Sequence, residues 1–255
     1  MRVKFLGVGE AFDENLPNTS ILVRAGGPEG SISSVLLDCG FTAPPQVWKS
    51  CPDPDELDAI WISHFHGDHF FGIPALLTRF WESGRKKPLL IVGQEGVSTT
   101  IPQAIKLAYA SIMDKFAFDL SFLEITPGEP AEAVGFTWKA AVNGHSQKDL
   151  AIRIEKDGKS VFYSGDGLPT DETLGLAHGC DLIIHEAFRL DQDVPGHGNM
   201  LTCIDFARKA RARSLALVHI QRHERRNRRD EIQGVIEGVS DPRVFMPEPD
   251  EEVEI

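Results

Sequence analysis

The chain has 255 residues, of which 42% are hydrophobic and 25% carry a charge. These proportions are typical of a folded globular protein and exclude an extensively disordered chain. Because layered α/β folds and barrels often reach this length undivided, we expect a single domain over residues 1–255. The acidic, proline-containing segment 247–255 is interpreted as a loose tail of that domain.

The sequence predicts a cytoplasmic protein with no membrane partner. No apolar run reaches about 18 residues, and the N-terminal segment before Gly7 is too short for a signal peptide. The four cysteines are scattered and form no C-x-x-C pair, which indicates neither a disulfide framework nor a structural zinc ribbon. Free thiols favour a reducing compartment.

The formal net charge is -12 at pH 7, which repels polyanions such as nucleic acids at long range. Nine of the 26 Lys and Arg residues nevertheless lie between Arg208 and Arg229. We interpret this basic segment as a solvated helix face, and a local patch that binds a polyanion remains the alternative.

The first third of the chain predicts short strands separated by turns rich in glycine and proline. These strands cover residues 3–8, 20–23, 34–37 and 57–62. The last of them ends abruptly in Ser63-His64-Phe65-His66-Gly67-Asp68-His69. Polar residues therefore crowd the end of this strand.

The remaining elements alternate between helical and strand patterns. The middle of the chain predicts helices at 70–81 and 94–113, with a strand at 88–92 between them. Strands follow within 116–154 and at 159–163. The last third predicts strands at 181–184 and 214–218, a helix at 200–211 and a polar helix after Glu224. Sheets with helices outside them indicate an α/β fold, a four-layer αββα sandwich rather than a doubly wound sheet. The segment 94–119 is the main candidate for a lid over a site.

The loop after the fourth strand contains three histidines and an aspartate within six residues, in the pattern H-x-H-x-D-H. Packing alone does not account for them, because each buried imidazole or carboxylate needs a polar partner. His64 and His66 can point the same way from an extended loop, while Asp68 and His69 can turn toward a second ion. One loop can then serve two divalent ions. Imidazole and carboxylate suit Zn²⁺, Mn²⁺ or Fe²⁺, so the ligands do not choose among these metals, and we expect Zn²⁺ with Mn²⁺ or Fe²⁺ as alternatives.

These residues and four further motifs resemble the metallo-β-lactamase superfamily, whose fold is this same sandwich. The motifs follow in the family's order over nearly the whole chain: Leu37-Asp38-Cys39-Gly40, the H-x-H-x-D-H loop, Asn143-Gly144-His145, Ser164-Gly165-Asp166 and Leu217-Val218-His219. The resemblance implies that the first metal is held by His64, His66 and His145, the second by Asp68, His69 and His219, and both by Asp166. It implies that Asp38 orients a ligand from behind, although an ordinary turn aspartate is as good an interpretation.

A second cluster resembles the tRNase Z-like phosphodiesterases within this superfamily. His185-Glu186-Ala187-Phe188 and Pro195-Gly196-His197-Gly198 are similar to their H-E-A-T and G-H-S motifs, with Phe188 in place of threonine and Gly198 in place of serine. The resemblance implies that His197 donates a proton to the leaving group or steadies the phosphate, and that Glu186 orients His197. A helix-start glutamate and a loop histidine without function are the alternative. Asp68 is counted with these two residues as catalytic, besides its role as a ligand.

The resemblance implies a two-metal hydrolase in which a metal-bridging hydroxide attacks the substrate. Only twenty residues separate His145 from Asp166, where bacterial tRNA-processing members insert a long arm that grips tRNA. We therefore predict a phosphodiesterase for a small-molecule or short, single-stranded nucleotide substrate, and not for intact tRNA. A hydrolase of a thioester, lactone or sulfate ester is the first alternative, and a non-catalytic ligand-binding member is the second. A homodimer is left open.

Overall fold

The computed structural model describes residues 1–27 and 30–255, which form two mixed β-sheets. The first sheet has the order β14-β1-β2-β3-β4-β5-β6, with β1 (Arg2–Gly7), β2 (Ser20–Gly26), β3 (Ile32–Leu37), β4 (Ala59–Ile62), β5 (Leu89–Gly93), β6 (Leu120–Glu124) and β14 (Glu252–Glu254). The second has the order β13-β12-β11-β10-β9-β8-β7, with β7 (Ala131–Ala133), β8 (Phe136–Val142), β9 (Leu150–Lys156), β10 (Lys159–Tyr163), β11 (Leu182–Glu186), β12 (Ser214–Val218) and β13 (Arg243–Phe245).

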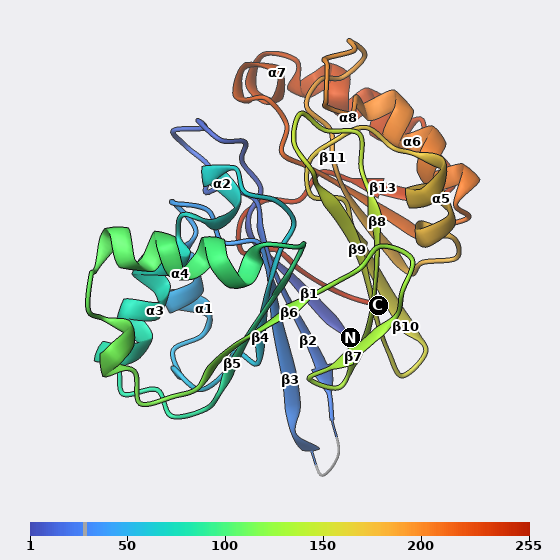
Figure 1. Cartoon of the computed structure of the whole chain (residues 1–255). Helices are drawn as coiled ribbons and strands as arrows, with labels where there is room; N and C mark the ends of the chain where they lie inside the picture. The colour runs from blue at the N-terminus through green and yellow to red at the C-terminus, as the bar shows by residue number, and fades with distance from the viewer. Residues whose placement is uncertain (28–29) are drawn as a thin grey trace.

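The two sheets pack face to face, and helices cover both outer faces (Figure 1). The rings of Trp61 and Trp138 meet between the sheets with centroids 6.4 Å apart. The helices on the first sheet are α1 (Pro44–Ser50), α3 (Ile73–Glu82) and α4 (Val97–Ala108), and those on the second are α5 (Asp171–Ala177), α6 (Met200–Lys209) and α8 (Arg229–Glu237). Strands buried on both faces, such as the wholly apolar β4, need this double cover. The predicted four-layer αββα sandwich is confirmed.

The helix predicted over residues 70–81 is confirmed as α3, but it begins only at Ile73, because a separate short helix, α2 (Gly67–Phe70), ends before it. The backbone N–H of Gly72 donates to the carbonyl of Cys39 at 2.9 Å instead of continuing the first helix. A side chain cannot be added there, since a Cβ on Gly72 would lie 2.2 Å from the carbonyl oxygen of Gly40. This close approach ties the H-x-H-x-D-H loop to the segment after β3.

The C-terminal segment was expected to be a loose acidic tail, and this expectation is wrong for its last residues. Strand β14 pairs antiparallel with β1, with Arg2 opposite Glu254 and Lys4 opposite Glu252. Val253 packs against the core between the sheets. A strand this short gains its stability from the ladder and from this apolar contact, which an acidic composition does not reveal.

Two further segments differ in detail from their predictions. The segment 94–119 forms α4 and the short helix η2 (Met113–Lys115), and Ile101 and Ile105 of α4 are buried against the first sheet. The polar helix expected after Glu224 begins earlier, as α7 (Arg222–Asn227), because the Gln221 side chain accepts hydrogen bonds from the first amides of the helix. None of the helices in the described part of the chain has the length and apolar character needed to span a bilayer.

Candidate metal centre

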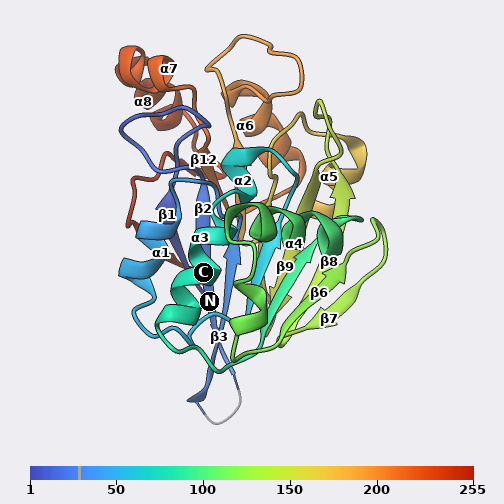
Figure 2. The ribbon, with the colours of Figure 1, turned by 60° about the vertical axis from the view of Figure 1, so that its left-hand side comes forward.

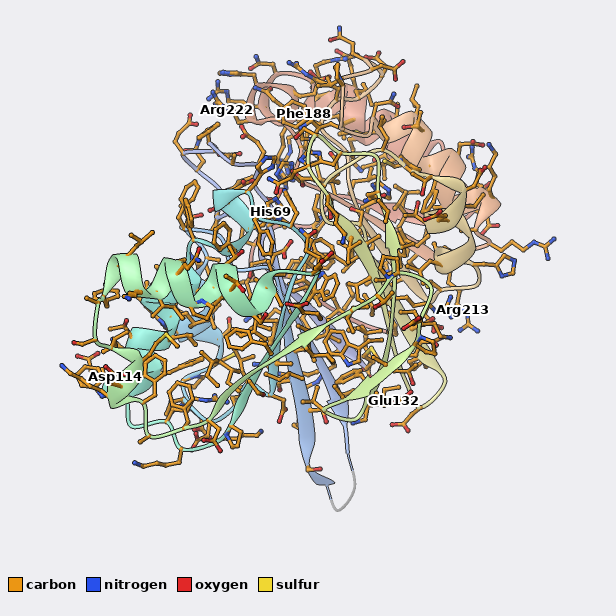
Figure 3. The ribbon with its side chains drawn as sticks, in the orientation of Figure 1. His69, Asp114, Glu132, Phe188, Arg213 and Arg222 are labelled. Carbon is orange, nitrogen blue, oxygen red and sulfur yellow. The ribbon has the colours of Figure 1, made fainter. Side chains whose placement is uncertain are left out.

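The polar residues singled out from the sequence follow the carboxyl ends of strands from both sheets. His64, His66, Asp68 and His69 come after β4, and His145, Asp166 and His219 come after β8, β10 and β12. They meet at one end of the sandwich, where α2 and α7 lie, whereas the β2–β3 hairpin marks the opposite end (Figure 2). Figure 3 shows His69 from the first sheet and Phe188 from the second at this end.

One group of side chains is placed to hold a first ion. Nδ1 of His66 lies 2.9 Å from Nε2 of His64 and 3.1 Å from Nε2 of His145. With a carboxylate oxygen of Asp166, these nitrogens all lie within 4.8 Å of one another. Three imidazole nitrogens converge so closely only where something between them accepts their lone pairs, which a divalent cation does.

A second group shares Asp166 with the first. Nε2 of His219 lies 3.2 Å from Oδ2 of Asp68 and 3.5 Å from Oδ1 of Asp166. Nε2 of His69 lies 3.3 and 3.4 Å from the same two oxygens. Although both are buried, Nε2 of His69 and Oδ1 of Asp166 make no hydrogen bond within the described structure. These inward-facing atoms fit a cation, and Asp166 is placed to touch two of them.

Protonation in the metal-free cluster shows how strongly the site attracts positive charge. Burial lowers the pKa of His219, but Asp166 and Asp68 outweigh burial and raise this pKa to about 9. Burial raises the pKa of Asp68, but its contacts with His219 and His69 hold this pKa well below the usual range. Protons thus occupy the space between imidazole and carboxylate, and a bound cation would replace them.

The outer nitrogens of the clustered histidines are held by hydrogen bonds. Nδ1 of His69 donates to Oδ2 of Asp38 at 2.7 Å, and Nδ1 of His145 donates to the carbonyl of Gly196 at 2.7 Å. Ser63 Oγ donates to Asp38 at 2.7 Å and therefore accepts from Nδ1 of His64, 3.0 Å away. Once its ring is neutral, each of these three residues consequently presents an unprotonated Nε2 to a metal ion.

The Asp38 carboxylate accepts several hydrogen bonds, and its partners besides His69 were not predicted from the sequence. Its carboxylate also accepts the amide of Ser63 at 2.8 Å and the hydroxyl of Tyr163 at 2.7 Å. Asp38 itself has a φ of 57°, a left-handed backbone conformation that a non-glycine residue adopts only under constraint. Ser63 and Tyr163 stand directly beside recognised motifs, but no spacing rule connects them to Asp38.

Glu186 and His197 lie together beside the two groups. Oε1 of Glu186 accepts the amides of Gly167 at 3.0 Å and Gly198 at 2.8 Å and lies 3.3 Å from Nδ1 of His197. Burial lowers the pKa of His197, but the contact with Glu186 outweighs burial and raises it. Phe188 stacks on the His197 ring at a centroid distance of 4.7 Å. The imidazole is thus held between a carboxylate and an aromatic face.

A pocket of about 460 Å³ opens onto these groups. It is lined by Glu10, Ala11, Phe12, Phe41, His66, Gly67, Asp68, Phe71, Asp166, Phe188, His197 and His219. No residue of the segment 94–119 is among them, so this segment is not a lid over the pocket. Phe12, Phe41 and Phe71 were missed because single phenylalanines in three separate loops form no pattern in the sequence.

Asp149 is a second buried carboxyl that the sequence did not reveal. It is fully buried, neither of its oxygens makes a hydrogen bond within the described structure, and Oδ2 lies 3.7 Å from Nδ1 of His64. Burial, with a smaller contribution from Asp166, raises the pKa of Asp149 well above its usual range. The group lies behind the metal-facing side of His64 and does not reach the pocket.

The basic segment between Arg208 and Arg229 is not one continuous patch. Arg213 and Arg222 lie at well separated places in the molecule (Figure 3). The arginines of α7 and the start of α8 each have an acidic partner: Arg222 with Glu10, Arg225 with Glu248, Arg226 with Glu14, Arg228 with Asp191 and Arg229 with Glu248. Their charges are therefore largely neutralised within the protein.

The sandwich has the metallo-β-lactamase fold, and its clustered His and Asp side chains together with relatives named ribonuclease Z identify a tRNase Z-like metal-dependent hydrolase of that superfamily. The family model described as Anti-Pycsar protein Apyc1 matches residues 1–239, and the chain belongs to this family.

Individual relatives agree with this placement. Ribonuclease Z of Picrophilus torridus is 30% identical over 235 residues, covering 72% of this chain and 75% of the relative. The metallo-β-lactamase fold protein YhfI of Bacillus subtilis has a TM-score of 0.82 and 23% identity, with 99% of each chain covered. The short form of human tRNase Z has a TM-score of 0.79 and 24% identity, covering 100% of this chain and 99% of that one.

Proposed function

We propose that the protein is a two-metal phosphodiesterase that acts on a small or short, single-stranded phosphodiester. The observation that carries this proposal is the position of His197, with the buried Glu186 3.3 Å from its Nδ1, in the same pocket as residues of the two ligand groups joined by Asp166. A hydrolase of a good leaving group needs only the metal groups. A phosphodiesterase expels a poor alkoxide and gains from a proton donor beside them.

The ligands divide between the two ions as the geometry groups them. His64, His66 and His145 would hold the first ion, Asp68, His69 and His219 would hold the second, and Asp166 would contribute to both sites. When bound, divalent ions there supply an activated water nucleophile and offset the charge of the phosphate. Zn²⁺ is favoured by this combination of imidazoles and carboxylates, and Mn²⁺ or Fe²⁺ remain compatible with it.

The chain's own residues place the proton donor. Glu186 is fully buried and its Oε1, fixed by two backbone amides, lies 3.3 Å from Nδ1 of His197, so it positions the ring and would leave the opposite nitrogen to donate the proton. Because Glu186 favours the charged imidazole, His197 is available as a donor near neutral pH. Phe188 limits rotation of the ring by stacking on it.

The size of the substrate follows from what surrounds the pocket. Between His145 and Asp166 the chain forms only the hairpin β9–β10, which belongs to the second sheet. The arginines nearest the pocket are engaged in ion pairs, which leaves a long polyanion little free positive charge to bind. A pocket of about 460 Å³ suits a ligand of the size of one nucleotide.

A substrate panel tests the proposal against hydrolysis of a thioester, lactone or sulfate ester. We expect turnover of bis(p-nitrophenyl) phosphate, of a nucleoside methyl phosphate and of a 3′,5′-cyclic nucleotide, with lower rates for a monoester and for nitrocefin. Intact pre-tRNA should be a poor substrate. Turnover of only a thioester, lactone or sulfate ester would refute the phosphodiesterase assignment, and accurate cleavage of a tRNA trailer would refute the limit on size.

The four cysteines also bear on where the protein acts. All are buried free thiols, and burial raises the pKa of Cys51 to about 12 and that of Cys180 to about 11. Thiols kept neutral and covered need no disulfide for the fold, which supports a cytoplasmic location.

A further inference from the structure

Three large apolar side chains at the mouth of the pocket are exposed to solvent. The exposed fractions are 74% for Phe12, 57% for Phe71 and 46% for Phe41. They come from three separate places, the β1–β2 loop, the end of α2 and the segment after β3. All three line the pocket that holds Asp68 and His219. Exposed apolar residues that gather around a polar site mark a surface that covers a ligand.

The rings of Phe12 and Phe41 are exposed and unstacked. Within the described structure neither ring packs on another aromatic ring, and Phe71 contacts only Phe70, at a centroid distance of 4.4 Å. A flat ring that carries its own apolar faces is the group that stacks on such a surface. Asp68, Asp166 and His197 line the same pocket, so the phosphodiester of the proposed reaction would lie beside these rings, next to the ions that the two carboxylates would hold.

The loop that carries Phe12 is fixed from outside the pocket. Oε2 of the buried Glu10 accepts the amide of Phe12 at 2.7 Å, while Oε1 accepts Nη1 of Arg222 at 2.6 Å. Glu14 on the same loop lies 3.8 Å from Arg222 and 3.6 Å from Arg226. Figures 1 and 2 both show this loop, in blue, beside α7, in red. The Phe12 backbone is thus preorganised, which lowers the entropy lost on binding.

We propose that Phe12 and Phe71 form a stacking subsite for the nucleobase of the substrate, and that Arg222 positions Phe12 for it through Glu10. A nucleobase fits better than an acyl chain, because the apolar lining of the pocket consists of Ala11 and four separate phenylalanine rings beside polar residues. This subsite rests on the proposed phosphodiesterase function and names the part of the substrate that lies beside the scissile phosphate.

The test compares two substrates that differ only in the base, a nucleoside 5′-(methyl phosphate) and ribose 5-(methyl phosphate). For Phe12→Ala we expect kcat/KM to fall by about 5- to 150-fold for the nucleoside ester and to change little for the ribose ester. Phe12→Tyr should keep the preference for the nucleoside ester over the ribose ester. Phe12→Leu should lose this preference, since leucine offers apolar area without a flat face. Phe71→Ala should act in the same direction.

Matched variants separate the subsite from general damage to the fold. Ile32→Ala removes a side chain that is 50% exposed at the start of β3 and does not line the pocket. It should leave kcat/KM unchanged for both substrates. Arg222→Ala should raise KM for the nucleoside ester by about two- to tenfold while kcat stays the same. Arg213→Ala, in which a mostly exposed arginine loses its partner Asp181, should have no effect.

Binding separates this proposal from the proposed function. A nucleoside 5′-monophosphate titrated into the metal-loaded protein should bind more weakly to Phe12→Ala than to wild type, whether or not the protein hydrolyses a diester. Three results for Phe12→Ala would overturn the subsite: an equal fall in kcat/KM for both esters, no fall for either, or wild-type affinity for the nucleoside monophosphate. Each would leave the phosphodiesterase assignment standing. A dimer that buries Phe12 and dissociates in Phe12→Ala would assign these rings to an interface instead.

Discussion

Oδ2 of Asp38 lies 2.7 Å from Nδ1 of His69, and the same carboxylate accepts the hydroxyl of Ser63, which supports His64. One buried carboxylate thereby orients a ligand in each of the two groups. Asp38→Asn should lower affinity at both metal positions by about 10- to 100-fold, because an amide cannot accept all of these hydrogen bonds. Chelator competition measures this.

The control for Asp38 is Asp58→Asn. The Asp58 carboxylate does not line the pocket, and it accepts a hydrogen bond of 2.8 Å from the amide of Ser34. It should leave metal affinity unchanged. A loss confined to the position of His69 in Asp38→Asn would show that the link through Ser63 to His64 does not affect metal affinity.

Metal content is the second prediction. Protein purified without chelator should contain about two divalent ions per chain, because both ligand groups are complete once Asp166 is shared. His219→Ala and His145→Ala should each reduce the content toward one, at different positions. A wild-type content of one ion, with Asp68 dispensable for binding, would contradict the two-metal centre.

The third prediction concerns His197, which touches the pocket but stands outside the two ligand groups joined by Asp166. His197→Ala should keep both metals and lower turnover of a diester with an alkyl or ribose leaving group by about 10² to 10⁴. The loss should shrink for p-nitrophenolate, which leaves without a proton. Glu186→Ala should resemble it more weakly, because Glu186 acts by orienting the imidazole.

A different outcome for His197 has a clear meaning. If His197→Ala keeps full activity toward the poor leaving group, the proton donor is elsewhere. If it loses metal, the residue acts as a ligand, which its position near Glu186 and His219 permits.

The fourth prediction uses the buried carboxyl of Asp149. Since burial raises its pKa, this group is protonated in the folded, metal-free protein at neutral pH and ionises on unfolding. The folded state then holds the extra proton, so stability falls as the pH rises above the unfolded pKa of about 4. Asp149→Asn should therefore raise the Tm of the metal-free protein by a few degrees at pH 7.5.

Thermal unfolding at two pH values checks this prediction. The gain should shrink to a small fraction at about pH 4, where the unfolded chain also keeps this proton about half of the time. A lower Tm for Asp149→Asn at pH 7.5 would mean that the carboxylate is ionised and holds His64.

Most strands and the order of the motifs could be predicted from the sequence, and the reason is local. A buried strand such as β12 reads as an apolar run, and His219 stands directly at its end. Gly72 and β14 could not be predicted, because their structure depends on contacts with Gly40 and β1, far away in the chain. The hydrogen bonds of Asp38 and the grouping of Phe12, Phe41 and Phe71 around the pocket could not be predicted for the same reason.

The two ligand groups draw their members from the ends of both sheets, which face each other across the inner core. A cation bound there cross-links the two halves of the sandwich, with Asp166 of one half lying against His69 of the other. Because only the docked halves assemble the ligands, binding adds to the free energy of unfolding as RT ln(1 + [L]/Kd). Metal supply would then set the lifetime of the protein as well as its activity.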